Sequence, residues 1–461
     1  MSAALRGHSG SEKIKYAVFA GFALLSICIG FYFSAPADIL DGLKTLILHH
    51  GLIDSDAFYI GGIGAAFVNS GLTVLISLFL FMLTRTSIGS SSISALLMMY
   101  GYSFYGKTVF NILPLMLGVY LYAHVKGEKL SKHSPMAGFA SAVGPIVSVI
   151  AFHNEILGKG SLIAIMVGIG LGLVTGVLIA YFANYMKVLI RGKSMYVGGF
   201  TAGVVAILMN SLLNGLGLGH GAYTDPPFVD QSYRFTLVIS MAIMLLYLVI
   251  VGIIGHGGIM YSLKLLISKQ PKRDYVKSHG FYVALISAGF LGLIGLAYFL
   301  LIPGSKMHGE MWAGIFTITA FSVIGLIPRY MYPFILGMLS GGVVIGGING
   351  LLVGSGFLTG ALTKIAARPT MMATFVGSGI SPITEKFGFK HTFTMGIIYG
   401  IITPSLSVLH GWMNTYNSGF ALGLVVILFF TGEFSIMNAE QSLYNRMNRY
   451  GFLDNFNRNK K

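Results

Sequence analysis

Long apolar runs recur along the whole chain, and they constrain its fold more than any other feature. Ala17–Phe33, Val68–Leu83 and Phe235–Ile254 are three of them. About 20 mostly apolar residues form a helix long enough to cross the core of a bilayer. Only 10% of the 461 residues are charged, whereas soluble proteins carry about a quarter. The sequence therefore predicts an all-α, polytopic membrane protein, and because the runs do not alternate polar and apolar residues they exclude a membrane barrel.

The apolar runs divide into seven segments in each half of the chain. Their ranges are 14–34, 58–84, 90–104, 108–124, 136–151, 161–188 and 194–216, and then 235–265, 278–302, 312–328, 330–354, 369–386, 391–411 and 414–436. Segments 90–104, 136–151 and 369–386 are short or interrupted by Gly, Ser and Pro. Irregular backbone at membrane depth is tolerated only where protein buries it or where it lines a wet cavity. We therefore expect half-helices or re-entrant segments there.

The basic residues predict how the chain crosses the membrane. They cluster at 126–132, 187–193, 264–277 and in the tail 439–461, and cytoplasmic loops are rich in Lys and Arg. This predicts a multi-pass protein of the bacterial cytoplasmic (inner) membrane, with both termini cytoplasmic and the tail on the lipid surface. Only Lys364 and Arg368 are left on the outside. The net charge of +15 is thus explained by basic loops that set the topology. The sequence has no basic stripe, so this charge does not favour nucleic acid as a partner.

Three blocks of sequence occur twice in the same order. "SFYGKTVFNILPLMLG" from Ser103 and "SVIGLIPRYMYPFILG" from Ser322 share Ser, Gly, Pro and Leu-Gly at one spacing, 219 positions apart. "GFTAGVVAIL" from Gly199 and "GFALGLVVIL" from Gly419 share six of ten positions. "FASAVGPI", which begins at position 139, pairs more weakly with "FVGSGISPI", which begins at 375. The blocks indicate an internal duplication of 1–216 in 235–438, joined by an extracytoplasmic linker, 217–234.

A duplicated unit with an odd number of segments must enter the membrane from the opposite side. Such inverted-topology repeats are typical of secondary transporters, whose solute sites lie near the midplane where broken segments meet. We therefore expect a carrier or channel-like transporter, not an enzyme, for a small polar solute, with an anion favoured. H⁺ coupling, Na⁺ coupling and passive flow stay open, as does a homo-oligomer. The alternatives are a membrane-embedded enzyme or lipid-handling protein, which needs clustered ionisable residues, and a scaffold without a central cavity.

Two charged residues are the first candidates for the solute site. Lys107 and Arg329 lie within the matched strings, although Phe110 is the position that aligns with Arg329. A charge at membrane depth is costly and usually functional, so we expect these two to attract an anionic group. The alternative is that each snorkels to the interface.

Polar residues near the breaks are the next candidates. Those expected to hydrogen-bond a solute, or else to join helices, are Ser103, Asn111, Ser141, Ser322, Tyr332, Ser378, Ser381 and Thr384. Glu433 and Glu385 are candidates for proton coupling, because membrane carboxylates serve as relays. There is no ATP-binding motif and no histidine pair with metal-ligand spacing, and the single cysteine, Cys28, excludes a disulfide within the chain. The sequence therefore predicts no cofactor and no metal.

Two stretches carry a resemblance to a known family. "GKTVFNILPLMLGVYLYA" (Gly106–Ala123) and "FYIGGIGAAFVNSG" (Phe58–Gly71) resemble an uncharacterised bacterial family of polytopic membrane proteins, a domain of unknown function. Its members are about as long as this chain, so the resemblance implies a similar fold throughout and brings no function. The arrangement is also loosely similar to the inverted-repeat carriers of urea, ammonium or nucleobases, although none of their motifs is present.

Overall fold

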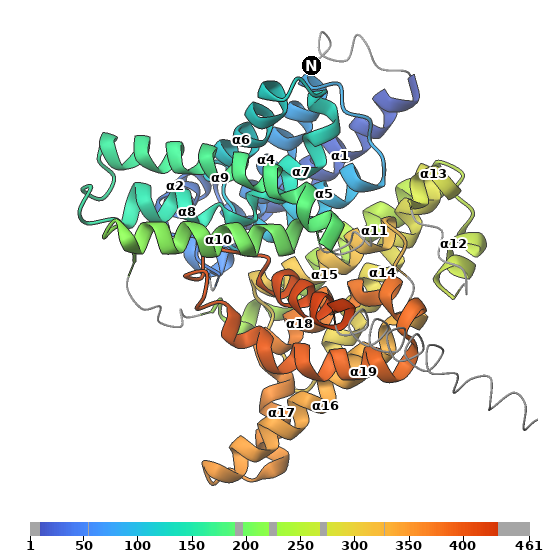
Figure 1. Cartoon of the computed structure of the whole chain (residues 1–461). Coiled ribbons are helices and arrows are strands. Elements are labelled where there is room, and N and C mark those ends of the chain that lie inside the picture. Colours follow the sequence, from blue (N-terminus) through green and yellow to red (C-terminus); the bar gives the residue numbers. More distant parts are fainter. Residues whose placement is uncertain are drawn as a thin grey trace, which may run out of the picture.

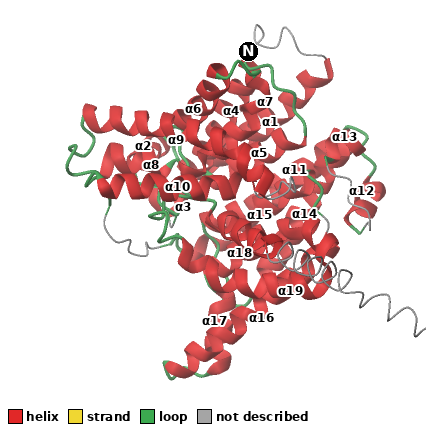
Figure 2. Cartoon of the chain, viewed as in Figure 1, coloured by secondary structure: helices red, strands yellow, loops and turns green. Residues whose placement is uncertain are grey.

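The computed structural model describes residues 10–53, 55–189, 197–220, 228–267, 274–326 and 328–431. Over these ranges the regular elements are helices and no strand occurs (Figure 2). In this part of the chain seven helices are long and apolar enough to cross a membrane. A bent pair, Leu130–Val143 with Pro145–His153, is either an eighth, broken span or a re-entrant loop. The predicted all-α polytopic membrane protein is therefore confirmed. Glu433 and the tail 439–461 lie outside the described residues.

The first half consists of long helices with a group of short ones between them. The long helices are α1 (Gly10–Phe33), α4 (Gly62–Leu83), α9 (Leu162–Leu189) and α10 (Val197–Gly215). The short elements are α2 (Pro36–Leu48), α3 (Ala57–Ile60), α5 (Ser90–Tyr102), α6 (Ile112–Val125), α7 (Leu130–Ala140), the 3-10 turn η1 (Ser141–Val143), α8 (Pro145–Ser148) and the π-turn η2 (Val149–His153). The interrupted segments 90–104 and 136–151 thus form a short helix and a bent pair of helices, as their Gly, Ser and Pro content predicts.

The second half follows the same order of elements. It contains η4 (Gln231–Tyr233), α11 (Arg234–Ile254), α12 (Ile259–Leu266), α13 (Tyr275–His279), α14 (Phe281–Leu301), α15 (Gly309–Val323), α16 (Pro328–Leu352), α17 (Phe357–Ala366), α18 (Arg368–Gly377), η5 (Ser378–Ile380), α19 (Ser381–Leu406) and the helix Asn417–Thr431. The predicted segment 235–265 is two helices, because the glycine-rich stretch 255–258 separates α11 from α12. In Figure 1 the two halves occupy different sides of the molecule, and α5 packs against α15 between them.

The repeated Ser-x-x-Gly string ends a half-helix in each copy. Gly106 after α5 has φ +89°, and Gly325 after α15 has φ +98°. The amide of Lys107 donates to the Tyr102 carbonyl over 3.2 Å, and that of Leu326 donates to the Phe321 carbonyl over 3.1 Å. Glycine is the usual residue for such a left-handed helix end. The chain therefore carries the string twice because each half ends one short helix in the same way, and Leu326 is the counterpart of Lys107.

The second break is also shared by the two halves. The Ser141 hydroxyl donates to the Gly138 carbonyl over 2.6 Å, and the Ser378 hydroxyl donates to the Phe375 carbonyl over 2.5 Å. Each serine begins a three-residue 3-10 turn. These serines lie 237 positions apart instead of 219, because the second half has a longer α16 and the additional α17. Those two helices project from the rest of the molecule (Figure 1), and their insertion weakens the sequence match in this block.

The third matched block forms a reciprocal contact between the two halves. A Cβ on Gly199 would lie 3.1 Å from the Cα of Gly419, and the rings of Phe200 and Phe420 stack at 5.9 Å. Gly203 packs under Phe420, and Gly423 packs under Phe200. Contacts in which i meets j and the equivalent j meets i are what a two-fold relation produces. They support an inverted repeat, whose orientation in the membrane remains a prediction.

Leucine at either glycine of this contact is expected to destabilise the protein by a similar amount. A Cβ at position 203 would lie 2.3 Å from the Phe420 ring, and one at position 423 would lie 2.5 Å from the Phe200 ring. Gly203→Leu and Gly423→Leu should each cost about 1–3 kcal/mol of unfolding free energy. Thermal unfolding in detergent measures this, with Gly170→Leu as control because nothing lies within 4 Å of a Cβ there. A loss in only one of the two variants would contradict the reciprocal packing.

A buried carboxylate joins the two halves near the start of α15. Asp56 Oδ1 accepts from the amides of Phe58 (3.2 Å) and Gly309 (3.1 Å), and Oδ2 accepts from the amide of Val229 (3.0 Å). Asp56 thus connects the first half, the end of the linker and the second half. Burial raises the pKa of its carboxyl from 3.8 to about 6, although the three amides oppose this.

The raised pKa of Asp56 predicts that stability decreases with rising pH. Since the folded pKa lies above the unfolded one, the folded state holds the proton longer, and stability is lost between about pH 4 and pH 6. The loss should be about 2–3 kcal/mol, with no further loss from this group above pH 7. Unfolding of the native protein and of Asp56→Asn across this window measures it. Only the native protein should lose stability across this window. An equal loss in Asp56→Asn would show that another group causes it.

Candidate functional site

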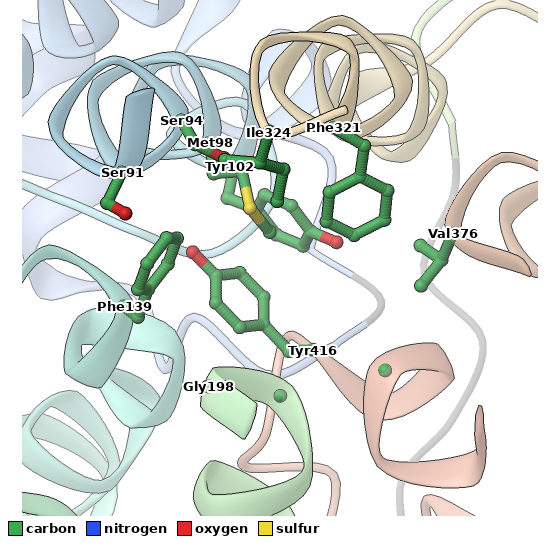
Figure 3. A pocket seen from close by; sticks show the side chains of 12 residues that line it. Ser91, Ser94, Met98, Tyr102, Phe139, Gly198, Phe321, Ile324, Val376 and Tyr416 are labelled. Carbon is green, nitrogen blue, oxygen red and sulfur yellow. The ribbon is translucent and has the colours of Figure 1, made fainter. Parts of the chain in front are cut away.

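A cavity of about 90 Å³ lies between the two halves (Figure 3). A water molecule needs about 10–15 Å³, so this cavity has room for a small solute. Its lining is mostly apolar and aromatic with a few hydroxyl groups, as in many small-molecule sites. The lining residues are Ser91, Ser94 and Met98 with Tyr102, Phe139, Gly198 and Gly199 from the first half, and Phe321, Ile324, Val376, Tyr416 and Gly419 from the second.

Two helices begin at this cavity. Gly198 and Gly199 lie in the first turn of α10, and Tyr416 and Gly419 flank the start of the helix Asn417–Thr431. The first amides of a helix have no partner within the helix, and its N-terminus carries a partial positive charge. Helix N-termini are therefore suited to anions. The reciprocal glycine contact brings the two N-termini together, and each half contributes one.

Lys107 lies directly behind the wall of the cavity. Its side chain is 1% exposed, and Nζ donates to Ser141 Oγ and to the Tyr416 hydroxyl, both over 2.8 Å. The ammonium group also lies 4.5 Å from the centre of the Tyr416 ring and 5.3 Å from that of Tyr102. Within the described part of the chain no carboxylate forms an ion pair with it. A buried charge without a counter-ion is expensive, which points to a function.

Two hydroxyl groups complete the polar part of the cavity. The Tyr416 oxygen accepts from Lys107, so its own hydrogen remains to be donated, and the lysine charge strengthens it as a donor. Figure 3 shows the Tyr416 ring extending into the cavity beside Tyr102. The buried hydroxyl of Ser94 has no hydrogen-bond partner among the described residues. The cavity therefore presents hydroxyl donors and the partial positive charge of two helix N-termini, which suits an anionic group.

The structure brings some of the sequence-predicted residues together around the first break. Lys107 and Ser141 are in direct contact. Ser103 Oγ lies 2.7 Å from both Thr73 Oγ1 and the carbonyl oxygen of Met99. Asn111 Nδ2 donates to the Gly106 carbonyl over 3.0 Å and to Ser148 over 3.1 Å. Ser103 and Asn111 thus stabilise the break that holds Lys107, and neither lines the central cavity.

The candidates in the second half lie farther from Lys107. Ser322, Ser378, Ser381 and Thr384 are buried at the second-half breaks but do not line the cavity. Arg329 and Tyr332 are exposed on α16, which fits the alternative of an interfacial position for Arg329. Glu385 is exposed near the end of its helical segment. The pairing of Lys107 with Arg329 at one site is therefore not what the structure shows.

Sequence reasoning did not single out three residues that the structure makes prominent. Tyr416 is the cavity residue that contacts Lys107, and its match to Tyr196 was the available signal. Glu310 and Arg368 form a buried ion pair with Nε and Oε2 3.1 Å apart. They lie far apart in the sequence, so spacing did not reveal the pair.

A comparison with known families fits this architecture. The model of a family described as "Protein of unknown function (DUF1576)" matches the chain over residues 35–215 and 257–432. The chain belongs to the DUF1576 family. This confirms the resemblance seen in the sequence, and the two matched ranges fall one in each half of the DUF1576 protein. No curated protein and no solved structure matches it.

Proposed function

We propose that this DUF1576 protein is a membrane transporter, either a secondary carrier or a channel-like protein, for a small polar solute with an anionic group. The solute would bind in the central cavity, between α10 and the helix Asn417–Thr431. The observation that carries the proposal is the buried Lys107, which contacts the cavity through Tyr416. Its partners in the described part of the chain include hydroxyl groups and no carboxylate. Two helix N-termini at the same place add to the attraction for an anion.

The location of the cavity supports transport over a reaction. Both halves line it, and in inverted-repeat transporters the solute site lies between the repeats. Among the described residues its lining contains hydroxyl, apolar and aromatic side chains but no carboxylate, histidine or cysteine. A membrane-embedded enzyme would need groups that exchange protons or attack a substrate. We propose the bacterial cytoplasmic membrane as its location, with both termini cytoplasmic, and leave open H⁺ coupling, Na⁺ coupling, passive flow and oligomerisation.

Thermal unfolding with a panel of solutes tests the proposal. A ligand that binds only the native protein raises the melting temperature by mass action. Small carboxylates, phosphates, amines and neutral polar solutes are each added to the purified protein at constant ionic strength. We expect stabilisation by one anion class, with an affinity about tenfold or more weaker in Tyr416→Phe and Lys107→Ala. Arg329→Ala, an exposed cation, is the matched control and should retain it.

Uptake then separates a transporter from a binding protein. The stabilising solute is added in labelled form to proteoliposomes containing the native protein, Lys107→Ala or Arg329→Ala. Saturable uptake by the native protein and Arg329→Ala, with none by Lys107→Ala, is the expected result. Binding without uptake, or an affinity for the solute that is unchanged in both cavity variants, would contradict the proposal.

A further inference from the structure

A second, wider cavity of about 530 Å³ opens where Phe228, the loop before α15, the end of α17 and the start of α18 meet. Lys306 and Arg368 line it together with His308 and Phe228. The Phe228 and His308 rings stack with their centres 4.9 Å apart. The Arg368 guanidinium lies over the Phe228 ring, 5.0 Å from its centre, in a cation–π contact. Burial, with Arg368 and Lys306 nearby, lowers the pKa of His308. Among the described residues, two cations and no acid line this vestibule.

The positive-inside rule does not explain why the vestibule contains basic residues. Arg368 is one of the two residues that the charge distribution leaves on the outside, whereas basic residues otherwise collect in cytoplasmic loops. A cation that topology does not require, held at the wall of an open cavity, needs another reason. Recognition of an anion supplies one, because guanidinium groups bind carboxylate and phosphate in planar, charge-assisted pairs.

Behind Arg368 lies a smaller polar cavity of about 50 Å³. Glu310 lines it, with Thr403, Ser407, Thr415, Asn417 and Ser418. The Arg368–Glu310 pair therefore stands between the vestibule and this inner cavity. The segment 415–419 separates the inner cavity from the central one, since Thr415 and Ser418 line the former while Tyr416 and Gly419 line the latter.

We propose that the vestibule is an outer binding site for a small carboxylate or phosphate anion, which replaces Glu310 as the partner of Arg368 and so opens the way to the inner cavity. Lys306 attracts the anion, and Arg368 binds it. Glu310, released from Arg368, faces the polar side chains of the inner cavity. This inference rests on the proposed function, because it describes how the anionic solute reaches the central cavity.

Anion binding in a Lys107→Met background tests the outer site alone. That substitution removes the central charge, so the remaining stabilisation by sodium phosphate or sodium acetate, at constant ionic strength, reports the vestibule. We expect a saturable rise in melting temperature, with the apparent affinity about tenfold or more weaker in Arg368→Gln and in Lys306→Gln. Lys159→Gln, at an exposed lysine paired with Glu155, should leave it unchanged. Lys306 is exposed, so its variant keeps the test valid if Arg368→Gln does not fold.

Glu310→Gln separates an exchangeable pair from a merely structural one. Removal of the competing carboxylate should make phosphate or acetate bind several-fold tighter, whereas a structural pair would give weaker binding and overturn the proposal. Phosphatidylglycerol in mixed micelles is the second arm. Stabilisation by this lipid but not by the soluble anions would assign the cations to a headgroup and overturn the proposal, as would no stabilisation at all. Neither outcome would affect the test of the central cavity, which uses the native Lys107.

Discussion

Lys107→Met is expected to raise the melting temperature of the protein while it weakens solute binding. Nζ is buried, and its partners among the described residues are hydroxyl, thioether and aromatic groups. Replacing buried charge by an apolar side chain of similar length often stabilises a protein, here by about 1–4 kcal/mol. The same change removes the charge that strengthens Tyr416 as a donor, so affinity for an anion should fall by about tenfold to a hundredfold. Opposite effects on stability and binding are typical of a residue kept for function.

Thermal unfolding with and without the stabilising solute measures both effects in one experiment. Arg329→Met is the matched control, because that cation is exposed and should change neither quantity by much. If Lys107→Met instead loses stability and still binds the solute, Lys107 serves the fold and the proposed site is wrong. Tyr416→Phe should weaken binding without the gain in stability, since it leaves the buried ammonium in place.

Asp56→Ala is expected to cause the largest loss of stability of any substitution considered, about 3–5 kcal/mol. One buried carboxylate accepts from three backbone amides in three separate segments. Alanine leaves these donors without their partner, and each unsatisfied buried group costs about 1–3 kcal/mol. Since the segments belong to the first half, the linker and the second half, the loss should also loosen the contact between the halves.

Unfolding at pH 7 in detergent checks this prediction. Asp41→Ala, at an exposed aspartate of α2, is the control and should cost well below 1 kcal/mol. The loss for Asp56→Asn should fall between those of Asp56→Ala and Asp41→Ala. The asparagine oxygen can still accept a hydrogen bond, but its NH₂ group would face a backbone N–H that also donates. A loss of less than about 1 kcal/mol for Asp56→Ala would show that the three hydrogen bonds do not join the halves.

The sequence predicted the helical membrane fold and the positions of the breaks. Bilayer thickness sets the length of apolar runs, and Gly106, Ser141 and Ser378 interrupt helices through local backbone chemistry. The match between the strings at Ser103 and Ser322 also indicated the duplication, because equivalent helix ends need equivalent residues. The register of the weaker block was harder to place, since α16 and α17 insert residues that only the structure locates.

The candidate site was predictable only in part. Lys107 stood out because charge is rare in apolar sequence, and its contact with Ser141 joins two of the predicted residues. Arg329 stood out for the same reason, but sequence does not show which face of α16 meets lipid or protein. The Glu310–Arg368 pair was not predicted, because a buried ion pair is defined by distance in space. The sequence singled out Arg368 only as a basic residue left on the outside, without a partner residue for it.

Solute protection of a cysteine at the mouth of the central cavity tests the central claim most directly. Ser91 is exposed and lines the cavity, and the only native cysteine, Cys28, is replaced by serine. The rate at which a small hydrophilic thiol reagent labels Ser91→Cys is measured with and without the stabilising solute, beside Ser87→Cys, which is exposed and does not line the cavity. We predict saturable protection of Ser91→Cys alone, lost when Lys107→Met is added. Equal labelling of Ser91→Cys with and without every solute of the panel would contradict a solute site between the two halves.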